Sequence, residues 1–486
     1  KMWKKAIGVF LGIPLLLFAI ITLLITFKKD AIVQELLATA NEDFKGKIAL
    51  SGTTISPFEN FPYISIDLKD FQVFETKKPN ETPIINIKDV YVGFDLWTII
   101  RGKFDIKTIK LANGKINITQ YQDNTFNLVK AFEPTKEVED LEEEFHIDLQ
   151  KIKIKNVDIL KTNLADTLTL EAFIDKAETR FKKDETYINM GLDAAFVFNI
   201  IKYKDTTFVK NKHFDVATDF SFHKETQLLK FEPSTVQLEN GLFGMEGSID
   251  MDDDFNMDLE FSGKKPNFDL LIAFAPEDLI PTLEKYDNQG EIFFSTTIKG
   301  KSSNGNLPAV EAKFGCKNGF FDNTITNKKL DEMAFSAYFT NGEKRNLETS
   351  AFYLTDFTAK PEAGRFKGNL KVINFVSPEI DLKLDSDFDL QFLSKFFNLN
   401  DLSNLPGNVQ LSMNFHDIID LAQPEKSLEK LNQAYFSELS VTNLNFKSDS
   451  YHLPVKNLNL KATMDGNDFK MEYCRLQLGK SNLELN

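Results

Sequence analysis

The chain has 486 residues, a formal net charge of −15 at pH 7 and a hydrophobic fraction of 42%. This apolar fraction is high enough for packed cores, which excludes a disordered protein, and the length corresponds to roughly two to four domains. Binding to nucleic acids, or to anionic headgroups by charge alone, needs clustered positive charge, so the acidic balance argues against both classes. Phenylalanine is abundant, with 46 residues against two Trp and 11 Tyr, so much of the aromatic surface has no polar group.

The first segment, KMWKKAIGVFLGIPLLLFAIITLLITFKK, predicts a helix that crosses a membrane. Its uncharged part would rise roughly 33 Å as a helix, enough for a hydrocarbon core of about 30 Å. A cleaved signal peptide is the alternative, but its apolar region would be shorter. Three lysines precede the span and two follow it, so the positive-inside rule favours a body on the far side of the membrane. Positions along the predicted span are Ala6, Phe10, Pro14, Phe18 and Phe27.

Residues 30–44 have helical spacing, and beyond them the apolar period changes to two. Strict alternation is typical of a sheet with one apolar face and one solvated face. Further helical patterns occur only at 270–286, 390–399 and, more weakly, 418–434. Asn-Gly pairs at 113–114, 240–241 and 341–342 predict turns between the strands. The alternating apolar positions that we predict on one face are Val90, Val92, Phe94, Phe255, Met257, Leu259, Phe261, Ile380, Leu382, Leu384, Leu411, Met413 and Phe415.

An acidic stretch and an internal repeat divide the chain. Residues 133–144, EPTKEVEDLEEE, carry seven acids and one lysine, which predicts a solvated linker over 133–150; an acidic docking strip is the alternative. Beyond it, a unit near 247–366 recurs at 368–486, with a shared FDL tripeptide and a matching glycine, Gly290 and Gly407. The second copy stops in a strand pattern, so we expect the natural protein to continue beyond residue 486.

Short segments between the predicted anchor and residue 131 resemble the N-terminal part of the AsmA family (AsmA/TamB/YhdP-like) of Gram-negative envelope proteins. The resemblance lies in PFENFPYISIDLKDFQVFE at 57–75, PIINIKDVYVGFDLWTIIRGKFDIKTIKLANGKINITQ at 83–120 and DNTFNL at 123–128. One departure is Asp123-Asn124, where relatives often have Asp-Gly. The repeats resemble the family's C-terminal module. The predicted domains are therefore an anchor at 1–29, an AsmA-like β domain at 30–132, the linker, and repeated β modules at 151–486.

This resemblance implies a mainly β fold, in which an anchor helix is followed by an elongated, curled antiparallel sheet that forms an apolar groove, with a few short helices. It also implies anchorage in the inner membrane, a body in the periplasm, and phospholipid movement toward the outer membrane. Alternation alone leaves a second architecture open, because the same pattern makes packed sandwich cores.

Catalytic and metal-binding signatures are absent from the sequence. It contains no P-loop, Rossmann fingerprint or H-E-x-x-H motif, and its five histidines are scattered. Five acids and Asn256 stand at every second position from Asp250 to Glu260 and suggest a calcium loop, but the sixth position is Phe255 where that loop needs Gly, so we interpret them as the wet face of a strand. Cys316 and Cys474 predict two free buried thiols, with pairing as the alternative. We expect no enzyme activity, cofactor or metal.

The sequence thus predicts an inner-membrane-anchored periplasmic protein that binds or conducts phospholipids by their acyl chains along an apolar groove and supports outer-membrane integrity. Expected partners are phospholipid acyl chains, the inner membrane and envelope proteins, with no nucleic acid. The alternative is a scaffold without transport activity, or a regulator of outer-membrane protein assembly. A conduit needs an unfilled apolar face, whereas a scaffold needs filled cores and an exposed patch for a partner.

Overall fold

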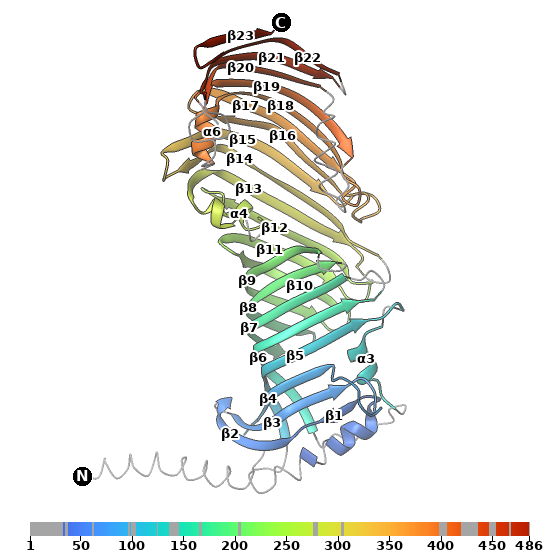
Figure 1. Ribbon diagram of the computed structural model, residues 1–486. Coiled ribbons are helices and arrows are strands. Elements are labelled where there is room, and N and C mark those ends of the chain that lie inside the picture. Colours follow the sequence, from blue (N-terminus) through green and yellow to red (C-terminus); the bar gives the residue numbers. More distant parts are fainter. Residues whose placement is uncertain are drawn as a thin grey trace, which may run out of the picture. The chain divides into compact units, whose positions relative to one another are not determined.

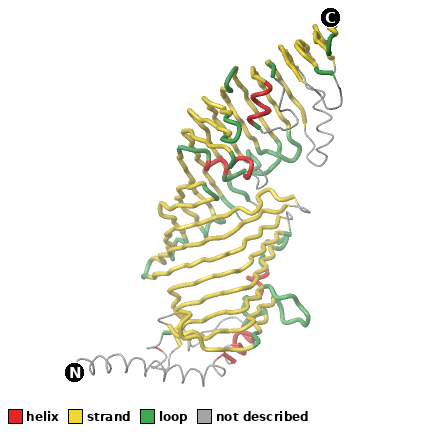
Figure 2. The backbone as a smooth tube through the Cα atoms, turned by 60° about the vertical axis from the view of Figure 1, so that its left-hand side comes forward, coloured by secondary structure: helices red, strands yellow, loops and turns green. Residues whose placement is uncertain are grey.

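The structure is a computed structural model, and it describes residues 33–34, 37–60, 63–95, 98, 104–123, 125–135, 145–164, 168–202, 206–275, 280–302, 306–397, 406–418, 436–446, 453–465 and 468–485. Within these ranges the fold is mainly β, with 23 strands in one open sheet and few helices (Figures 1 and 2). This confirms the predicted fold class at that level. The chain divides into two compact units, one of residues 1–225 with 234–239 and the other of residues 226–233 with 240–486.

Strands of the N-terminal unit pair mostly in chain order. Both β1 and β2 pair with β3, and antiparallel pairing continues through β4 and β5 and again from β6 to β9. The pair β5–β6 is parallel, which needs a crossover connection, and the chain between these strands includes α3. The bounds are β1 Lys47–Ala49, β2 Gly52–Asn60, β3 Tyr63–Phe74, β4 Ile85–Phe94, β5 Phe104–Gln120, α3 Asn127–Ala131, β6 Phe145–Asn163, β7 Leu168–Lys183, β8 Tyr187–Lys202 and β9 Thr206–His223. The boundary between the two units falls inside the next strand, β10 Leu228–Leu238.

Short helical segments cover part of the sheet in the N-terminal unit. Residues 37–43 are helical, as predicted, and the Asn41 side chain both donates to the carbonyl of Ile48 and accepts from its N–H. Val33 and Leu37 pack on Ile64, Ile66 and Phe94. In a second cluster Ala131 of α3 packs on Val73 and Ile84. This end of the sheet therefore has a filled core.

Strands of the C-terminal unit are antiparallel neighbours in chain order from β11 to β23. Two helical regions interrupt the strands, and one of them is confirmed at its predicted place as α6. The bounds are β11 Gly241–Asp250, β12 Asn256–Lys265, α4 Asp269–Ile272, α5 Ile280–Leu283, β13 Tyr286–Gly300, β14 Ala309–Asn323, β15 Lys328–Thr340, β16 Ala351–Lys360, β17 Gly364–Ile373, β18 Glu379–Asp389, α6 Leu390–Phe396, β19 Asn408–Ile418, β20 Phe436–Phe446, β21 Val455–Asp465, β22 Asp468–Leu478 and β23 Ser481–Leu485.

The sequence repeat has a structural counterpart within this unit. Two strands, a helical region and four strands follow one another from β11 to β16, and the same order returns from β17 to β22; the helical region is α4 and α5 in the first copy and α6 in the second. The matching glycines have the same role in both copies. A methyl group on Gly290 would lie 2.9 Å from the Cα of Gly319, and one on Gly407 would lie 2.4 Å from the Cα of Leu444. In each copy the glycine therefore lets one strand approach a β-bulge in the next strand, where the register shifts.

Several sequence predictions need correction. Asn113-Gly114 is no turn but lies inside β5, where Asn113 adopts a φ of 59° that Asn tolerates. The other two Asn-Gly pairs do lie at chain reversals. The helical pattern at 270–286 divides into α4 and α5, and its last residue begins β13.

The expected linker at 133–150 is partly strand, because β6 begins at Phe145, and residues 136–144 lie outside the described residues. The two units divide near residue 225, and the predicted domain boundaries at 132 and 150 stay predictions. In the part of the chain that the structure describes, no helix is long and apolar enough to cross a membrane. The predicted span at 6–27 and the weak helical pattern at 419–434 lie outside the described residues.

Candidate functional site

One row of directly paired residues crosses the C-terminal unit from β12 to β19. Such residues project to the same face of a sheet, and we name this side the apolar face. Predicted side chains on β12, β18 and β19 lie at every second position from the row, so they share this face with it. The row consists of Gly263, Phe294, Phe314, Ala337, Leu354, Leu370, Leu382 and Phe415. The predicted members are Met257, Leu259, Phe261, Ile380, Leu382, Leu384, Leu411, Met413 and Phe415.

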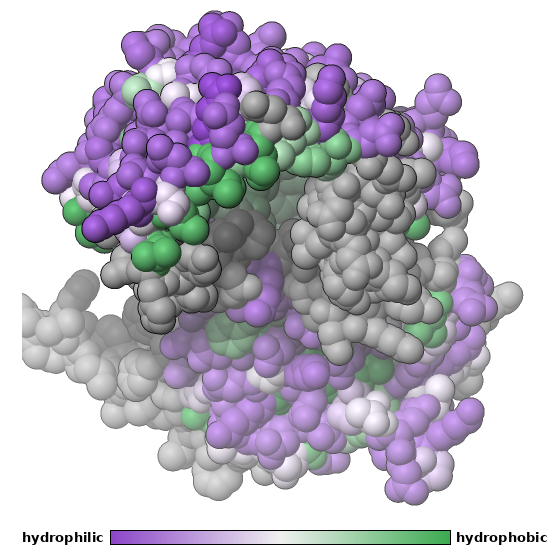
Figure 3. Space-filling model, turned by 45° about the horizontal axis from the view of Figure 1, so that its top comes forward, coloured by the Kyte–Doolittle hydropathy of each residue, from purple (hydrophilic) through white to green (hydrophobic). Residues whose placement is uncertain are grey.

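These predicted side chains are half-buried, apart from the buried Phe415. The opposite side of the sheet, the outer face, is solvated and charged. On it Lys371 pairs with Asp381 at 3.2 Å, and Lys383 and Asp385 are exposed. Figure 3 views this unit from its end, with hydrophilic residues over the outer side and hydrophobic residues on the inner side of the curved sheet. Along much of the apolar face the side chains therefore lack the full burial of a packed core.

Phenylalanines form a continuous strip on the apolar face. The rings of Phe294 and Phe314 are near parallel with centroids 6.3 Å apart, and Phe314 and Phe352 are 6.2 Å apart. Phe274, which follows α4, stacks on Phe294 at 5.3 Å and remains 53% exposed. Phe243 closes the strip with an edge-to-face contact to Phe294 at 5.2 Å. Sequence reasoning missed this strip, because the alternating positions predicted for the apolar face do not include these phenylalanines.

The helices cover one margin of the apolar face (Figure 1). Leu270 of α4 is fully buried over Gly263, where a methyl group would lie 3.0 Å from its Cδ2. In the second copy Leu393 of α6 packs on Phe388 and Val409. The Phe396 carbonyl at the end of α6 accepts hydrogen bonds from the Tyr286 hydroxyl at 2.7 Å and from Asn323 at 2.8 Å. The first copy thus fixes the helix of the second.

Four predicted members of the apolar face lie elsewhere. Phe94 is buried in a cluster with Val33 and Leu37, Val90 is buried in another with Val157, and Val92 packs against both clusters. A short helical segment folds over this part of the sheet, which alternation alone could not reveal. Phe255 is wrong for a different reason: it belongs to the turn before β12, with a φ of 52° and 44% exposure.

The acidic run is likewise divided between a turn and a strand. Asp253 and Asp254 lie in the β11–β12 turn, where both pair with Lys301. Asp258 and Glu260 project from β12 to the outer face, as predicted. Throughout the described ranges no group of three or more His, Cys, Asp or Glu side chains is arranged to hold a metal ion.

A charged cluster occupies the polar side of the N-terminal sheet. Lys69 bridges Asp67 and Asp89, and Thr54 donates to Asp67 at 3.3 Å. Asp67 is 1% exposed, and this burial raises its pKa against the lowering effect of Lys69. Hydrogen bonds to the two carboxylates raise the pKa of Lys69. The cluster holds β3 and β4 together by an ion pair between the buried carboxylate of Asp67 and a Lys69 side chain that is 37% exposed.

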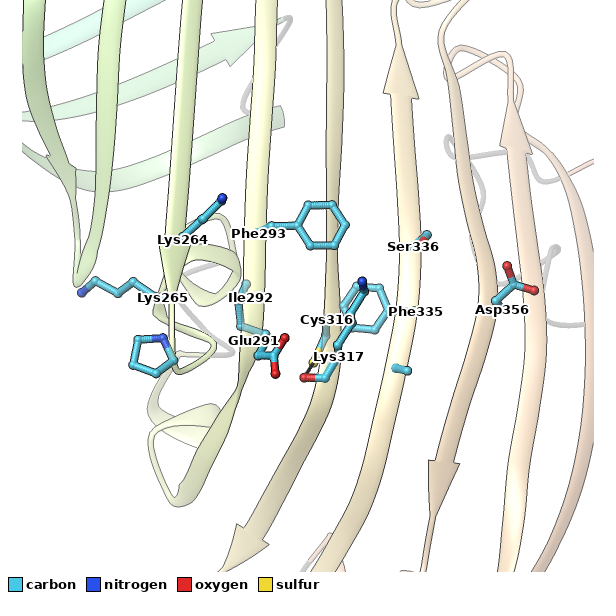
Figure 4. A pocket seen from close by; sticks show the side chains of 12 residues that line it. Lys264, Lys265, Glu291, Ile292, Phe293, Cys316, Lys317, Phe335, Ser336 and Asp356 are labelled. Carbon is cyan, nitrogen blue, oxygen red and sulfur yellow. Dashed lines mark hydrogen bonds between the residues drawn. The ribbon is translucent and has the colours of Figure 1, made fainter.

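A shallow depression of about 870 Å³ lies across β12–β16, lined by charged and apolar residues including Lys264, Glu291 and Phe293 (Figure 4). The Phe293 ring lies over Gly315, where a methyl group would be 2.7 Å from two ring carbons. This contact accounts for an aromatic residue on the outer face, because rings commonly cover strand glycines. Cys316, also at the depression, is buried and its pKa is raised from 9.0 to about 11 by that burial. It is a free thiol, as is the half-buried Cys474.

Comparisons of the chain with protein-family models, with curated proteins and with solved structures found no match.

Proposed function

We propose that the protein binds phospholipids by their acyl chains along the apolar face, and that it conducts them between the inner and outer membranes while anchored in the inner membrane. The observation that carries the proposal is a one-layer sheet with a charged outer face and a half-buried apolar face. A sheet of this kind must cover its apolar side with another layer or with a ligand.

Energetics favour an alkyl ligand on the strip and the aliphatic rows beside it. Each methylene that leaves water contributes about 0.8 kcal/mol. The row from Phe294 to Leu382 consists of apolar side chains on successive strands. Because they offer no hydrogen-bonding group, a peptide backbone on this row would lose its bonds to water without replacement. Similar affinity at neighbouring positions would let a chain slide from strand to strand.

A scaffold or regulator of outer-membrane assembly is the second candidate. The N-terminal unit favours it, because Val90, Phe94 and Val157 are buried in filled clusters and offer no open apolar surface there.

The test is native mass spectrometry of the full chain, purified from membranes of an expression host and exchanged into a lipid-free detergent. We expect co-purifying phospholipids that are lost in a Leu259→Asp, Phe261→Asp double variant. Phe255→Asp is the matched control, since Phe255 lies in the adjacent turn. A folded wild type free of lipid would reject the conduit and favour the scaffold.

A further inference from the structure

An arginine stands at the margin of the apolar face, at the end of β13. Gly300 pairs with Met257 of the apolar face. A methyl group on Gly300 would lie 3.0 Å from the Nη1 atom of Arg345. Arg345 comes from the β15–β16 connection and has a φ of 56°, which is uncommon for a residue with a side chain. The fold thus places a guanidinium against the sheet where the apolar surface begins.

This guanidinium has unused hydrogen-bonding capacity. Of its five N–H donors, one is used at 2.9 Å by the carbonyl of Leu307, and within the described residues no carboxylate pairs with it. Neighbouring cations are already neutralised, Lys301 by Asp253 and Asp254 and Lys344 by Glu348 at 3.6 Å. In a chain with a net charge of −15, a half-buried arginine that no acid of the described residues pairs with is available for an external anion.

The loop that carries Arg345 is held in place by its own hydrogen bonds. Asn341 accepts from the N–H of Val310 at 2.9 Å and donates to the Pro308 carbonyl at 2.9 Å. Thr349 donates to the Asn341 carbonyl at 2.8 Å, and the Arg345 N–H donates to the Gly342 carbonyl at 3.1 Å. The backbone that carries Arg345 is therefore fixed by the fold, and the bond to the Leu307 carbonyl directs its guanidinium.

We propose that Arg345 binds the phosphate of a lipid whose acyl chain lies on the apolar face; the inference rests on the proposed function and adds the headgroup site. A guanidinium fork matches phosphate oxygens in pairs. From Gly300 the apolar-face positions of β13 continue through Ile298 and Thr296 to Phe294 of the strip. Six residues of strand span about 20 Å, and one lipid tail fills half of a hydrocarbon core of about 30 Å.

A tail of about 15 Å anchored at Arg345 would therefore extend past Ile298 to about Thr296, close to Phe294 of the strip. Leu307, whose carbonyl accepts from Arg345, is itself 52% exposed and adds apolar surface beside the headgroup site. This geometry orders the ligand across the groove, with the headgroup at the margin and the tail along a strand.

The experiment measures dissociation constants of the full chain for two ligands with one tail, 1-palmitoyl-lysophosphatidic acid and 1-monopalmitin. Arg345→Gln should weaken binding of the phosphate-bearing lipid about tenfold and leave binding of monopalmitin within about twofold. Arg345→Lys should fall between, because it keeps the charge and loses the fork. Arg365→Gln is the matched control: Arg365 is exposed, projects to the outer face opposite Asp387, and should change neither constant.

Three results would overturn the headgroup site. The first is that Arg345→Gln weakens the binding of both lipids equally, and the second is that it weakens the binding of neither. The third is that inorganic phosphate binds the wild type as tightly as the phospholipid does and no longer binds the variant, which would assign the site to free phosphate. A wild type that binds neither lipid would instead reject the proposed function itself, and the headgroup site with it.

Discussion

The close approach of Gly407 to the β20 bulge makes a quantitative prediction. In Gly407→Ala the new methyl group would lie 2.4 Å from the Cα and 2.9 Å from the Cβ of Leu444. Carbon atoms prefer about 3.5–4.0 Å, so the two segments must separate by about 1 Å. That movement also breaks the hydrogen bond from the Asn445 N–H to the Pro406 carbonyl, now 2.9 Å long. Overpacking of this kind costs about 1–3 kcal/mol and the lost bond about 1 kcal/mol.

We therefore expect Gly407→Ala to destabilise the C-terminal unit by about 2–4 kcal/mol. The assay is urea unfolding of the full chain, followed by hydrogen exchange in peptides from β19 to β21. Gly244→Ala is the control, because the nearest atom to its added methyl would be the Ser262 Oγ at 3.5 Å, an ordinary contact. Equal midpoints for Gly407→Ala and wild type, or equal losses in both variants, would refute the assigned role of the repeat glycine.

Further predictions concern the thiols and the buried ion pair. In native protein a maleimide should label Cys474 and spare the buried Cys316 until urea unfolds the chain; equal labelling rates would contradict the burial. Because the unfolded thiol of Cys316 loses its proton near pH 9.0 and the native thiol near about 11, the native state binds more protons in this window. Stability should thus fall by about 2–3 kcal/mol as the pH rises through it, and Cys316→Ala should remove that dependence in pH-resolved urea titrations. Lys69→Met leaves the buried Asp67 without its cation; because the Lys69 side chain is 37% exposed and solvent screens part of the attraction, the loss should be about 1–3 kcal/mol by urea unfolding. Lys371→Met breaks an exposed pair and should cost no more than about 1 kcal/mol, so similar losses would argue against the buried cluster.

Alternation predicted the apolar face where strands run straight and regular. The runs on β12, β18 and β19 keep strict period two, and their registers bring Leu259, Leu382 and Met413 to one side. A strand's own pattern determines which of its faces is apolar, and pairing carries that face to the next strand. This part of the candidate site could therefore be predicted without knowing which strands were neighbours.

Prediction failed where backbone geometry or a distant segment decides the outcome. Asn113-Gly114 permits either a turn or a left-handed residue inside a strand, and the structure has the second, with Asn113 at a φ of 59° within β5. Phe94 satisfies the alternation of an open face, but Val33, from a separate helical segment, buries it. The position of Arg345 follows from the folding of its loop onto Gly300, and no local pattern in the sequence marks it.

Site-specific photo-cross-linking tests the central claim most directly. A benzophenone amino acid is introduced in the full chain either at Leu382, on the apolar face, or at the adjacent Lys383, on the exposed outer face. After irradiation in cells, mass spectrometry of the purified protein identifies lipid adducts. We expect phospholipid adducts at Leu382 and none at Lys383, because successive strand residues face opposite sides. Adducts of equal yield at both positions, or at neither, would contradict lipid binding on the apolar face.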